Sequence, residues 1–287
     1  MKFHLIIAMY NVEEWIVENI DMLRQQTYQS FNVVIIDDIS TDKTVTLAND
    51  AINGDKRFNF VINTEKKYKT RNVVDGITYA NAAPEDVIIL LDGDDRLFDK
   101  NVLQTVADTY QQDDCWMTYG SFIRSAGRKK NNKAYKQSVI DEHSYRQNKW
   151  LASHLKTFKY ALWCKLNMDI FQVSELDVKN AVKRSLLSFN LKRWFAWRKI
   201  KANDLHDDSG LYIKRVDDKA FSYPMLEMSG EKASFIDSPL YYYRNDVTDY
   251  SSAMRNFGVQ NSEKQYTRII RDILIHKKPY TRLTSLS

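Results

Sequence analysis

The sequence predicts an α/β fold in which helices flank a mostly parallel sheet. Four short runs rich in β-branched and other apolar residues lie in the first hundred residues, at 3–10, 31–37, 58–63 and 87–92. They alternate little between apolar and polar residues, which is typical of strands covered on both faces. Helical stretches separate them, and the repeated strand, helix, strand order indicates right-handed crossovers in a Rossmann-like sheet.

The spacing of apolar residues places the helices. Apolar side chains recur every three to four residues at 12–26, 41–52, 70–82 and 99–112. A further strand is expected at 115–123, and a closing helix at 264–275 in a C-terminal helical tail.

This order of elements divides the chain into three parts. Residues 1–115 are expected to bind a nucleotide, and residues 116–245 are expected to bind its reaction partner as the second half of one continuous fold. Residues 246–287 form the tail. In open α/β sheets, ligands bind beyond the carboxyl ends of the strands, so the functional residues are expected at that edge.

Composition favours a folded globular protein with an anionic partner. Basic residues exceed acidic ones by 42 to 37, a net charge of +5. The basic stretch 127–136 lacks interleaved aromatic residues and is interpreted as a solvated loop, so no nucleic-acid partner is expected. No apolar run is long enough for a transmembrane segment and no signal peptide is evident, which predicts a cytoplasmic protein; peripheral contact with a membrane stays open. Cys115 and Cys164 lack metal or redox spacing and are expected to be buried reduced thiols.

The most informative stretch is VIILLDGDDRL, where a buried strand ends in Asp92, Gly93, Asp94 and Asp95. Carboxylates this close repel, and each raises the pKa of its neighbour unless a cation neutralises the group. The simpler alternative is a turn, because Asp and Gly are common turn formers. Two other strands also end in polar residues, which favours a shared ligand site over independent turns.

A metal is the expected cofactor of this site. Neither a GxGxxG fingerprint nor a P-loop sequence occurs, so no glycine loop is expected to hold phosphates. Carboxylates can instead hold Mn²⁺ or Mg²⁺, which binds diphosphate oxygens. Gly93 is expected to leave room for a ligand that approaches the backbone closely.

With four motifs in order, the chain resembles the family-2 glycosyltransferases of the GT-A fold. The motifs are MYN at 9–11, IIDDISTD at 35–42 after QQTY at 25–28, the pair Arg71 and Asn72, and DGDD as the DxD-type motif. The resemblance implies that residues 1–115 bind a nucleotide-sugar donor and residues 116–245 bind an acceptor and supply a catalytic base.

The resemblance also implies roles for single residues of the first half. Tyr10 and Asp38 would contact the nucleotide base, and Asp94 would be the principal metal ligand. Asp92 would bind the ribose or the donor sugar, with Asp95 a less certain neighbour. The remaining residues that would line the donor site are Ala8, Asn11, Arg71, Asn72 and Gly93. Asp42 is interpreted as a helix cap, and Asp37 as a residue that orients its loop.

In the second half, VDDKAFSYPMLEMSG at 216–230 resembles the catalytic-base region. Asp218 would be the base, with Asp217 beside it in the place of the usual Glu. The alternative is that both residues only cap an amphipathic helix at 219–228. HLKTFKYALW at 154–163 resembles another family segment and makes His154 a candidate contact for the acceptor or a phosphate.

The segment SLLSFNLKRWFAWRKIK at 185–201 is basic and aromatic. Its NLKRW sequence is similar to a motif of processive synthases, but it precedes the base region, whereas the family order places that motif after it. We expect a basic aromatic helix that packs on the fold; contact with an acceptor or a membrane surface stays open.

The resemblance implies an inverting, metal-dependent transfer of a sugar from a nucleotide diphosphosugar, by default a UDP-sugar, to a hydroxyl of a glycan or other acceptor. A nucleotidyltransferase would need a glycine- and arginine-rich signature after the first strand, where the chain has AMYNVEEW. A non-catalytic nucleotide- or glycan-binding module of the same fold stays open as the alternative.

Overall fold

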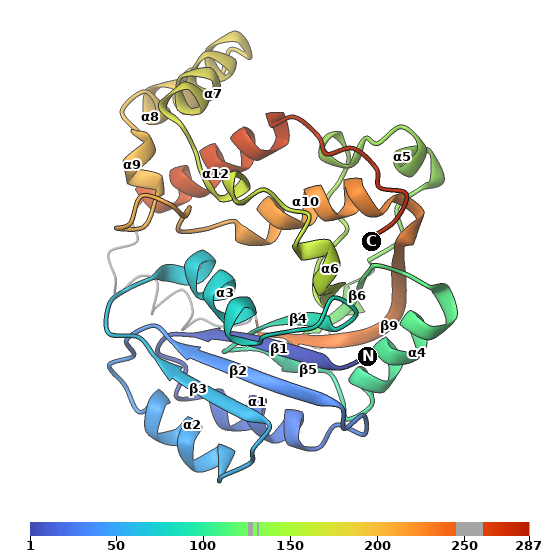
Figure 1. Cartoon of the computed structure of the whole chain (residues 1–287). Helices are drawn as coiled ribbons and strands as arrows, with labels where there is room; N and C mark the ends of the chain where they lie inside the picture. The colour runs from blue at the N-terminus through green and yellow to red at the C-terminus, as the bar shows by residue number, and fades with distance from the viewer. Residues whose placement is uncertain (126–128, 131, 245–260, 287) are drawn as a thin grey trace.

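The structure, a computed structural model, describes residues 1–125, 129–130, 132–244 and 261–286, without the side chains of residues 129, 130, 217 and 261. Part of the basic stretch 127–136 and the start of the predicted tail, 246–260, therefore lie outside the described residues. Figure 1 shows the ribbon.

Within the described residues, nine strands form one sheet with the order β3-β2-β1-β4-β8-β6-β9-β5, and β7 pairs with β6. The strands are β1 (Phe3–Met9), β2 (Phe31–Asp37), β3 (Phe58–Ile62), β4 (Val87–Asp92), β5 (Arg96–Leu97), β6 (Met117–Arg124), β7 (Lys129–Lys130), β8 (Lys156–Lys159) and β9 (Ala233–Tyr243). The longest pairings, β1 with β2 and β4, β2 with β3 and β6 with β9, are parallel, so most paired residues are in parallel register. The predicted mostly parallel sheet is confirmed.

Helices cover both faces of this sheet. The α-helices are α1 (Ile16–Arg24), α2 (Thr44–Ile52), α3 (Tyr68–Tyr79), α4 (Val102–Asp113), α5 (Gln137–Asp141), α6 (Tyr160–Trp163), α7 (Glu175–Leu187), α8 (Leu191–Trp197), α9 (Ala202–Leu205), α10 (Asp217–Ser229) and α12 (Asn261–His276). Short 3₁₀ turns are η1 (Tyr145–Gln147), η2 (Met168–Phe171) and η3 (Gly230–Lys232).

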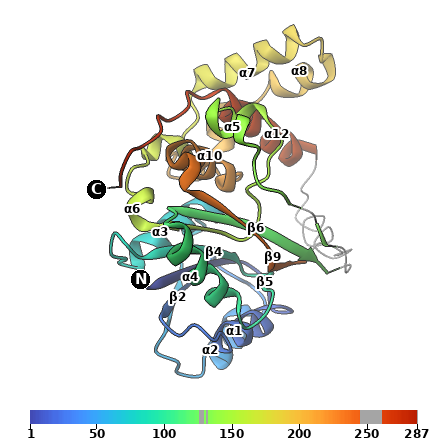
Figure 2. The ribbon, with the colours of Figure 1, turned by 90° about the vertical axis from the view of Figure 1, so that its right-hand side faces the viewer.

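The strand side chains alternate between two cores. In β1, Leu5 and Ile7 pack with α1, α2 and α4 on one face, whereas Ile6 packs with α3 on the other. The second core continues into α6 and α10, and α12 lies above them as a further layer (Figures 1 and 2). The runs without polar alternation are therefore strands buried on both faces, as expected.

Helix α3 lies unusually close to the sheet. A Cβ atom on Gly76 would lie 2.4 Å from Cγ2 of Ile6 and 3.1 Å from Cδ1 of Ile36. Only glycine allows this approach, and the contact sets the distance between α3 and β1 at this point of the helix.

The base-region helix α10 is buried on almost every side, which corrects the expectation of an amphipathic helix. Residues 220–230 are all buried because α10 lies between the sheet and α12. Its Glu227 forms a fully buried ion pair with Arg146 of η1, with Nε–Oε1 and Nη2–Oε2 distances of 2.5 and 2.9 Å. Arg146 also donates to the carbonyl of Leu274 in α12, and the N–H of Tyr280 donates to Glu227 at 2.9 Å. This pair ties α10 to the closing helix.

Two further expectations can be compared with the structure. Cys115 is buried and Cys164 is exposed, so the prediction of two buried thiols is wrong for Cys164; both thiols are free. The predicted closing helix is confirmed as α12, whose buried residues are Ile269, Ile270, Ile273 and Leu274. Among the described residues, no helix combines the length and the apolar composition that crossing a bilayer requires.

Candidate active site

Three carboxylates meet where β4 ends. Asp92 is the last residue of β4 and pairs in register with Ala8 of β1. Carboxylate oxygens of Asp92, Asp94 and Asp95 all lie within 4.8 Å of one another. Oxygen ligands at this spacing suit a small divalent cation. The structure thus brings the three acids together at the carboxyl end of β4, and their roles toward a ligand stay predictions.

The pKa values of these acids differ because the groups around each carboxylate differ. Asp92 lies 2.6 Å from Nζ of Lys69. Burial acts to raise the pKa of Asp92, but the positive charge of Lys69, its hydrogen bond to Asp92 and the charge of Lys156 lower it to about 2. Burial and the charge of Asp92 raise the pKa of Asp94 to about 6.

Asp95 is held most firmly. It is buried, the hydroxyl of Tyr241 donates to its Oδ2 at 2.8 Å, and the N–H of Arg244 donates to its Oδ1 at 2.8 Å. Burial and the charges of Asp94 and Asp92 raise its pKa to about 8. The same Tyr241 hydroxyl accepts from the N–H of Asp92 at 3.2 Å. Because β5 pairs with β9, the end of β9 reaches the acidic motif and fixes Asp95.

Asp94 is the acid best placed to bind a cation. For Asp94 the described residues provide a hydrogen bond from its own backbone N–H, whereas Asp92 pairs with Lys69 and both oxygens of Asp95 accept hydrogen bonds. Gly93 has a packing reason for its identity: a Cβ there would lie 2.7 Å from Cβ of Met9. Contact with β1 therefore requires glycine, whether or not a ligand also approaches.

Asp38 lies in a buried network that starts α3. Its Oδ1 accepts from the N–H of Lys67 at 2.8 Å, and its Oδ2 accepts from the N–H of Tyr68 at 3.0 Å. The amide of Asn63 donates to Asp38 at 3.2 Å and to Oδ1 of Asn72 at 2.7 Å. Asp38 and Asn72 thus contact protein groups in this structure, and their predicted contacts with a donor stay predictions.

Tyr10 is covered by a lysine. Nζ of Lys66 lies 3.1 Å from the centroid of the Tyr10 ring. The same Nζ donates to the backbone carbonyl of Asp38 at 3.0 Å and lies 3.2 Å from Oδ2 of Asp38. Burial is the main cause that lowers the pKa of Lys66. A nucleotide base that packs on this face of Tyr10 would have to displace Lys66.

The loops after β1 and β2 fix each other. Asn11 accepts through Oδ1 from the N–H of Thr41 at 2.8 Å, and its own N–H donates to Ser40 at 2.9 Å. Asp37 accepts from the N–H of Ser40 at 2.9 Å, which fits its predicted role in orienting the loop. Asp42 accepts from the N–H of Thr44, the first residue of α2, at 3.0 Å, but the N-cap position belongs to Lys43, so Asp42 contacts the start of α2 from one residue before the cap.

Arg71 extends from α3 toward the loop before α10. Its Nη1 lies 3.2 Å from Oε1 of Glu65 and 4.0 Å from Oδ2 of Asp207. Asp207 is buried and also accepts from the hydroxyl of Ser209 at 2.7 Å. Arg71 therefore links the two predicted halves, and its contact with a donor stays a prediction.

His154 lies against the tyrosines that hold the acids. Its ring stacks on Tyr241 and Tyr243, with centroid distances of 4.6 and 5.3 Å. Burial, followed by the charge of Lys156, lowers the pKa of His154 to about 3, although Asp92 and Asp218 act in the opposite direction. His154 is therefore neutral, and the charges of Asp92 and Asp218 both act on it.

Asp218 lies at the start of α10, and its charge acts on His154. Asp217 and Asp218 are the first two helical residues, and the N-cap position belongs to Val216, which makes no side-chain capping hydrogen bond. The interpretation of the two acids as N-cap residues is therefore wrong. The side chain of Asp217 lies outside the described part of the structure.

Two β-branched residues beside predicted site acids have a left-handed backbone. Ile39 follows Asp38 with φ 65°, and Val216 precedes Asp217 with φ 67°. This region is unfavourable for β-branched side chains and costs about 1–3 kcal/mol, so such residues concentrate at functional sites. Both distortions lie in loops that direct predicted site acids.

Sequence comparison decides the family. Residues 4–171 match the family described as Glycosyl transferase family 2. The chain belongs to glycosyltransferase family 2. This glycosyltransferase is 22% identical over 250 residues to glycosyltransferase GlyG of Streptococcus pneumoniae serotype 4, covering 84% of this chain and 69% of GlyG.

Solved structures share the fold of this glycosyltransferase. The crystal structure of S. aureus TarS 1–349 superposes with a TM-score of 0.56 at 18% identity, covering 96% of this chain and 71% of that chain. TarS 1–349 in complex with UDP-GlcNAc gives a TM-score of 0.58 at 17% identity, covering 96% and 72%. At sequence identities of 17–18%, the structural similarity is evidence for the fold alone. The predicted GT-A architecture is confirmed.

Three residues that contact the candidate site were not predicted from the sequence: Lys66, Lys69 and Tyr241. The lysines lie in the basic run KKYKTR directly before Asn72, and a cluster of cations upstream of an acidic motif was a usable signal. Tyr241 had no comparable signal, because its contact with Asp95 joins residues 146 positions apart.

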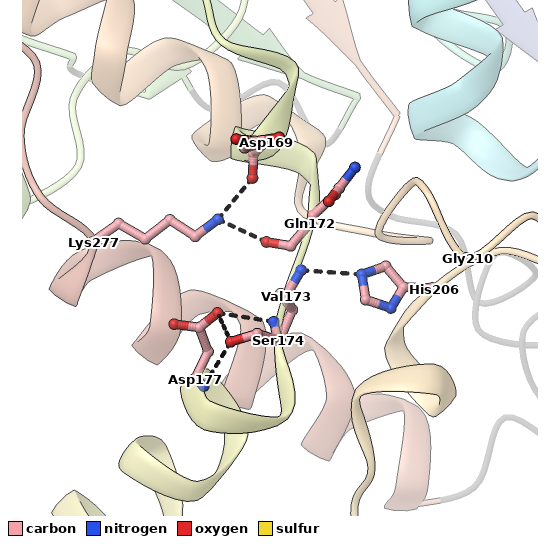
Figure 3. Close-up of a pocket in the computed structure, with 8 residues that line it drawn as sticks. All are labelled: Asp169, Gln172, Val173, Ser174, Asp177, His206, Gly210 and Lys277. Carbon is pink, nitrogen blue, oxygen red and sulfur yellow. Dashed lines mark hydrogen bonds between the residues drawn. The ribbon is translucent and has the colours of Figure 1, made fainter.

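A separate hollow of about 310 Å³ lies where α7 begins (Figure 3). Its polar groups largely pair with one another. Nζ of Lys277 donates to the carbonyls of Asp169 and Gln172, and Nε2 of His206 accepts the N–H of Val173 at 3.0 Å. The lining residues of this hollow include none of the predicted site residues of the glycosyltransferase.

Proposed function

We propose that this glycosyltransferase moves a sugar from a nucleotide diphosphosugar, with UDP as the nucleotide, to a hydroxyl of a glycan or other acceptor, with inversion and dependence on Mn²⁺ or Mg²⁺. The observation that supports this best is the cluster of Asp92, Asp94 and Asp95 oxygens within 4.8 Å of one another. The choice of UDP is supported by TarS, which has the same fold and whose crystal structures include complexes with UDP-GlcNAc and with UDP.

The residues present fit a divalent cation. The site offers only oxygen donors from its acids, and the pKa values of Asp94 and Asp95 are raised by burial and by repulsion between the acids, which a cation would relieve. Asp94 would be the main ligand, with Asp92 beside it. A bound cation would supply Lewis-acid stabilisation of the leaving diphosphate.

Side chains around the acids would bind the donor. Lys69 lies beside Asp92, and the charge of Lys156 also acts there, so the site has cations of its own near the place for a diphosphate. Tyr10 would pack against the base once Lys66 moves aside. The other residues proposed to line the donor site, in the half 1–115, are Ala8, Asn11, Asp38, Arg71 and Asn72.

Asp218 would act as the base. The acceptor oxygen attacks the anomeric carbon while the bond from that carbon to the diphosphate oxygen breaks, and the hydroxyl proton passes to the Asp218 carboxylate. A single displacement with one base inverts the anomeric centre. Neutral His154, on which the Asp218 charge acts, would orient the acceptor or a phosphate by hydrogen bonding. Asp217 would support Asp218, and residues 116–245 would form the acceptor half. A cytoplasmic location stays a prediction.

The test is nucleotide release from a panel of UDP-, GDP-, TDP- and CMP-sugars with Mn²⁺. Asp218→Asn should keep Mn²⁺-dependent UDP binding and lower turnover by at least about 10²-fold. Asp94→Asn should lose the metal dependence of binding. Asp42→Asn is the matched control, because it makes the same change in a helix-starting acid at the same edge of the sheet. Full turnover in Asp218→Asn would remove the base assignment, and UDP binding indifferent to Mn²⁺ would remove the metal role.

A further inference from the structure

Helices α7 and α8 form a hairpin that projects from the molecule at the end opposite α1 and α2, in both views of the ribbon (Figures 1 and 2). We call residues 182–201 the basic hairpin. Its foot is anchored: Trp197 is buried and donates Nε1 to Gln265 at 3.2 Å, and Arg184 pairs with Asp272 of α12 at 2.5 Å. The expected packing on the fold is therefore correct for this part of the segment.

The tip of the basic hairpin is apolar and open to solvent. Large apolar side chains there are exposed by these fractions: Phe189 91%, Leu187 68%, Leu191 55%, Phe195 52% and Leu186 43%. Five such residues within ten positions form a group, unlike the single exposed apolar residues that are normal on protein surfaces.

The basic hairpin carries only positive charge. Residues 182–201 contain seven basic residues and no acidic one: Lys183, Arg184, Lys192, Arg193, Arg198, Lys199 and Lys201. A hollow of about 670 Å³ at its foot is lined by further cations, Lys264 and Arg268, together with Lys192 and Lys199, against one acid, Asp204. The surface next to the exposed apolar tip is therefore strongly basic.

We propose that the basic hairpin docks this protein onto the surface of an anionic lipid bilayer. Exposed leucine and phenylalanine side chains would enter the acyl boundary, and the flanking lysines and arginines would meet anionic headgroups, which is the pattern of interfacial helices. This inference goes beyond the proposed reaction and does not depend on it.

The charge and the side-chain types select this partner over two others. A second copy of the chain would place seven like charges against seven, and repulsion opposes that contact. A nucleic acid would satisfy the cations, but it offers no hydrocarbon for the aliphatic Leu186, Leu187 and Leu191. A bilayer with anionic lipids satisfies both the charge and the apolar tip.

The test is flotation of the full-length protein with phosphatidylcholine vesicles that either contain or lack phosphatidylglycerol, at low and high ionic strength. The wild-type chain should float with the anionic vesicles at low salt and much less at high salt. Leu187→Ser with Phe189→Ser should lower the partition at least about tenfold, and Lys192→Glu with Arg193→Glu at least about 30-fold.

Matched controls make the same chemical changes elsewhere. Ile62→Ser with Tyr79→Ser removes two apolar side chains of 54% and 49% exposure, and Lys56→Glu with Lys100→Glu gives the same change of net charge on exposed residues outside the hairpin. Both should float like the wild type, and all variants should keep the wild-type melting temperature because the changed side chains are exposed. Absence of wild-type flotation, or wild-type flotation by the hairpin variants, would overturn the proposal. Sedimentation showing a dimer that Leu187→Ser with Phe189→Ser dissociates would assign the tip to self-association instead.

Discussion

Removing the Glu227 side chain should destabilise the protein strongly, because it leaves a buried guanidinium without its partner. Both members of the ion pair are nearly inaccessible, with side-chain exposures of 3% for Arg146 and 0% for Glu227. Glu227→Ala removes two charge-assisted hydrogen bonds to Arg146 and the acceptor for the N–H of Tyr280.

The expected loss is about 3–5 kcal/mol for the broken ion pair, with about 1 kcal/mol more for the N–H left without an acceptor. The free energy of unfolding of a typical protein is about 5–15 kcal/mol, so the variant should remain folded only marginally. At about 2–4 °C per kcal/mol, the melting temperature should fall by about 8–24 °C.

Urea denaturation and calorimetry compare Glu227→Ala with the wild type. A double-mutant cycle uses the wild type, Glu227→Met, Arg146→Met, and Arg146→Met with Glu227→Met. The double variant should be near wild type in stability, because apolar residues of similar volume replace a costly buried pair. A loss below about 1 kcal/mol in Glu227→Ala would refute the argument, since the pair would then be hydrated. A loss of unfolding free energy in the double variant equal to the sum of the losses in the two single variants would also refute the argument.

The other predictions concern smaller groups. Gly93→Ala should lower the free energy of unfolding by about 1–3 kcal/mol in chemical denaturation, because its methyl group would overlap Met9; an unchanged midpoint would contradict this. Lys66→Met should tighten UDP binding about 2–10-fold by calorimetry, because the base need not displace a cation from the ring it covers; weaker binding would mean that the lysine itself contacts the nucleotide. Burial lowers the pKa of His206 below 6.5, and its Nε2 accepts from Val173, so the folded state keeps it neutral. The stabilisation of the folded state by neutral His206 should be complete above about pH 6.5 and should be lost as the pH falls below about 6.5. The His206→Gln variant should not show this loss, so parallel profiles of unfolding free energy against pH for the two proteins would contradict the assignment.

The sequence was sufficient for features that depend on local pattern. The first four strands were predicted to within about one residue at each end, because buried parallel strands are continuous apolar runs. The acidic motif was recognised because Asp92, Asp94 and Asp95 are adjacent in the chain and their repulsion follows from chemistry alone.

Features that depend on distant pairing could not be predicted in this way. The pairing of β5 with β9 brings Tyr241 and Arg244 to Asp95, and no local pattern indicates a two-residue strand such as β5. Helix α10 was expected to be amphipathic because its sequence contains Ser222 and Glu227 among apolar residues. Both polar residues are buried, and the partner of Glu227 lies 81 positions away.

The close contact at Gly76 means that the proposed donor site can be altered by a substitution where α3 packs on the sheet, away from the acids. The first five residues of α3 include Lys69, Arg71 and Asn72, and a helix transmits a displacement along its length because it is stiff. A methyl group on Gly76 would overlap Ile6 by about 1 Å, and shifts of that size can change reaction rates by about 10²-fold. Trimming Ile6 to alanine would make room for the methyl group and should return α3 to its place. The spacing between the helix and the sheet, set by two residues that touch no substrate, is therefore a second determinant of where the lysine meets the acids.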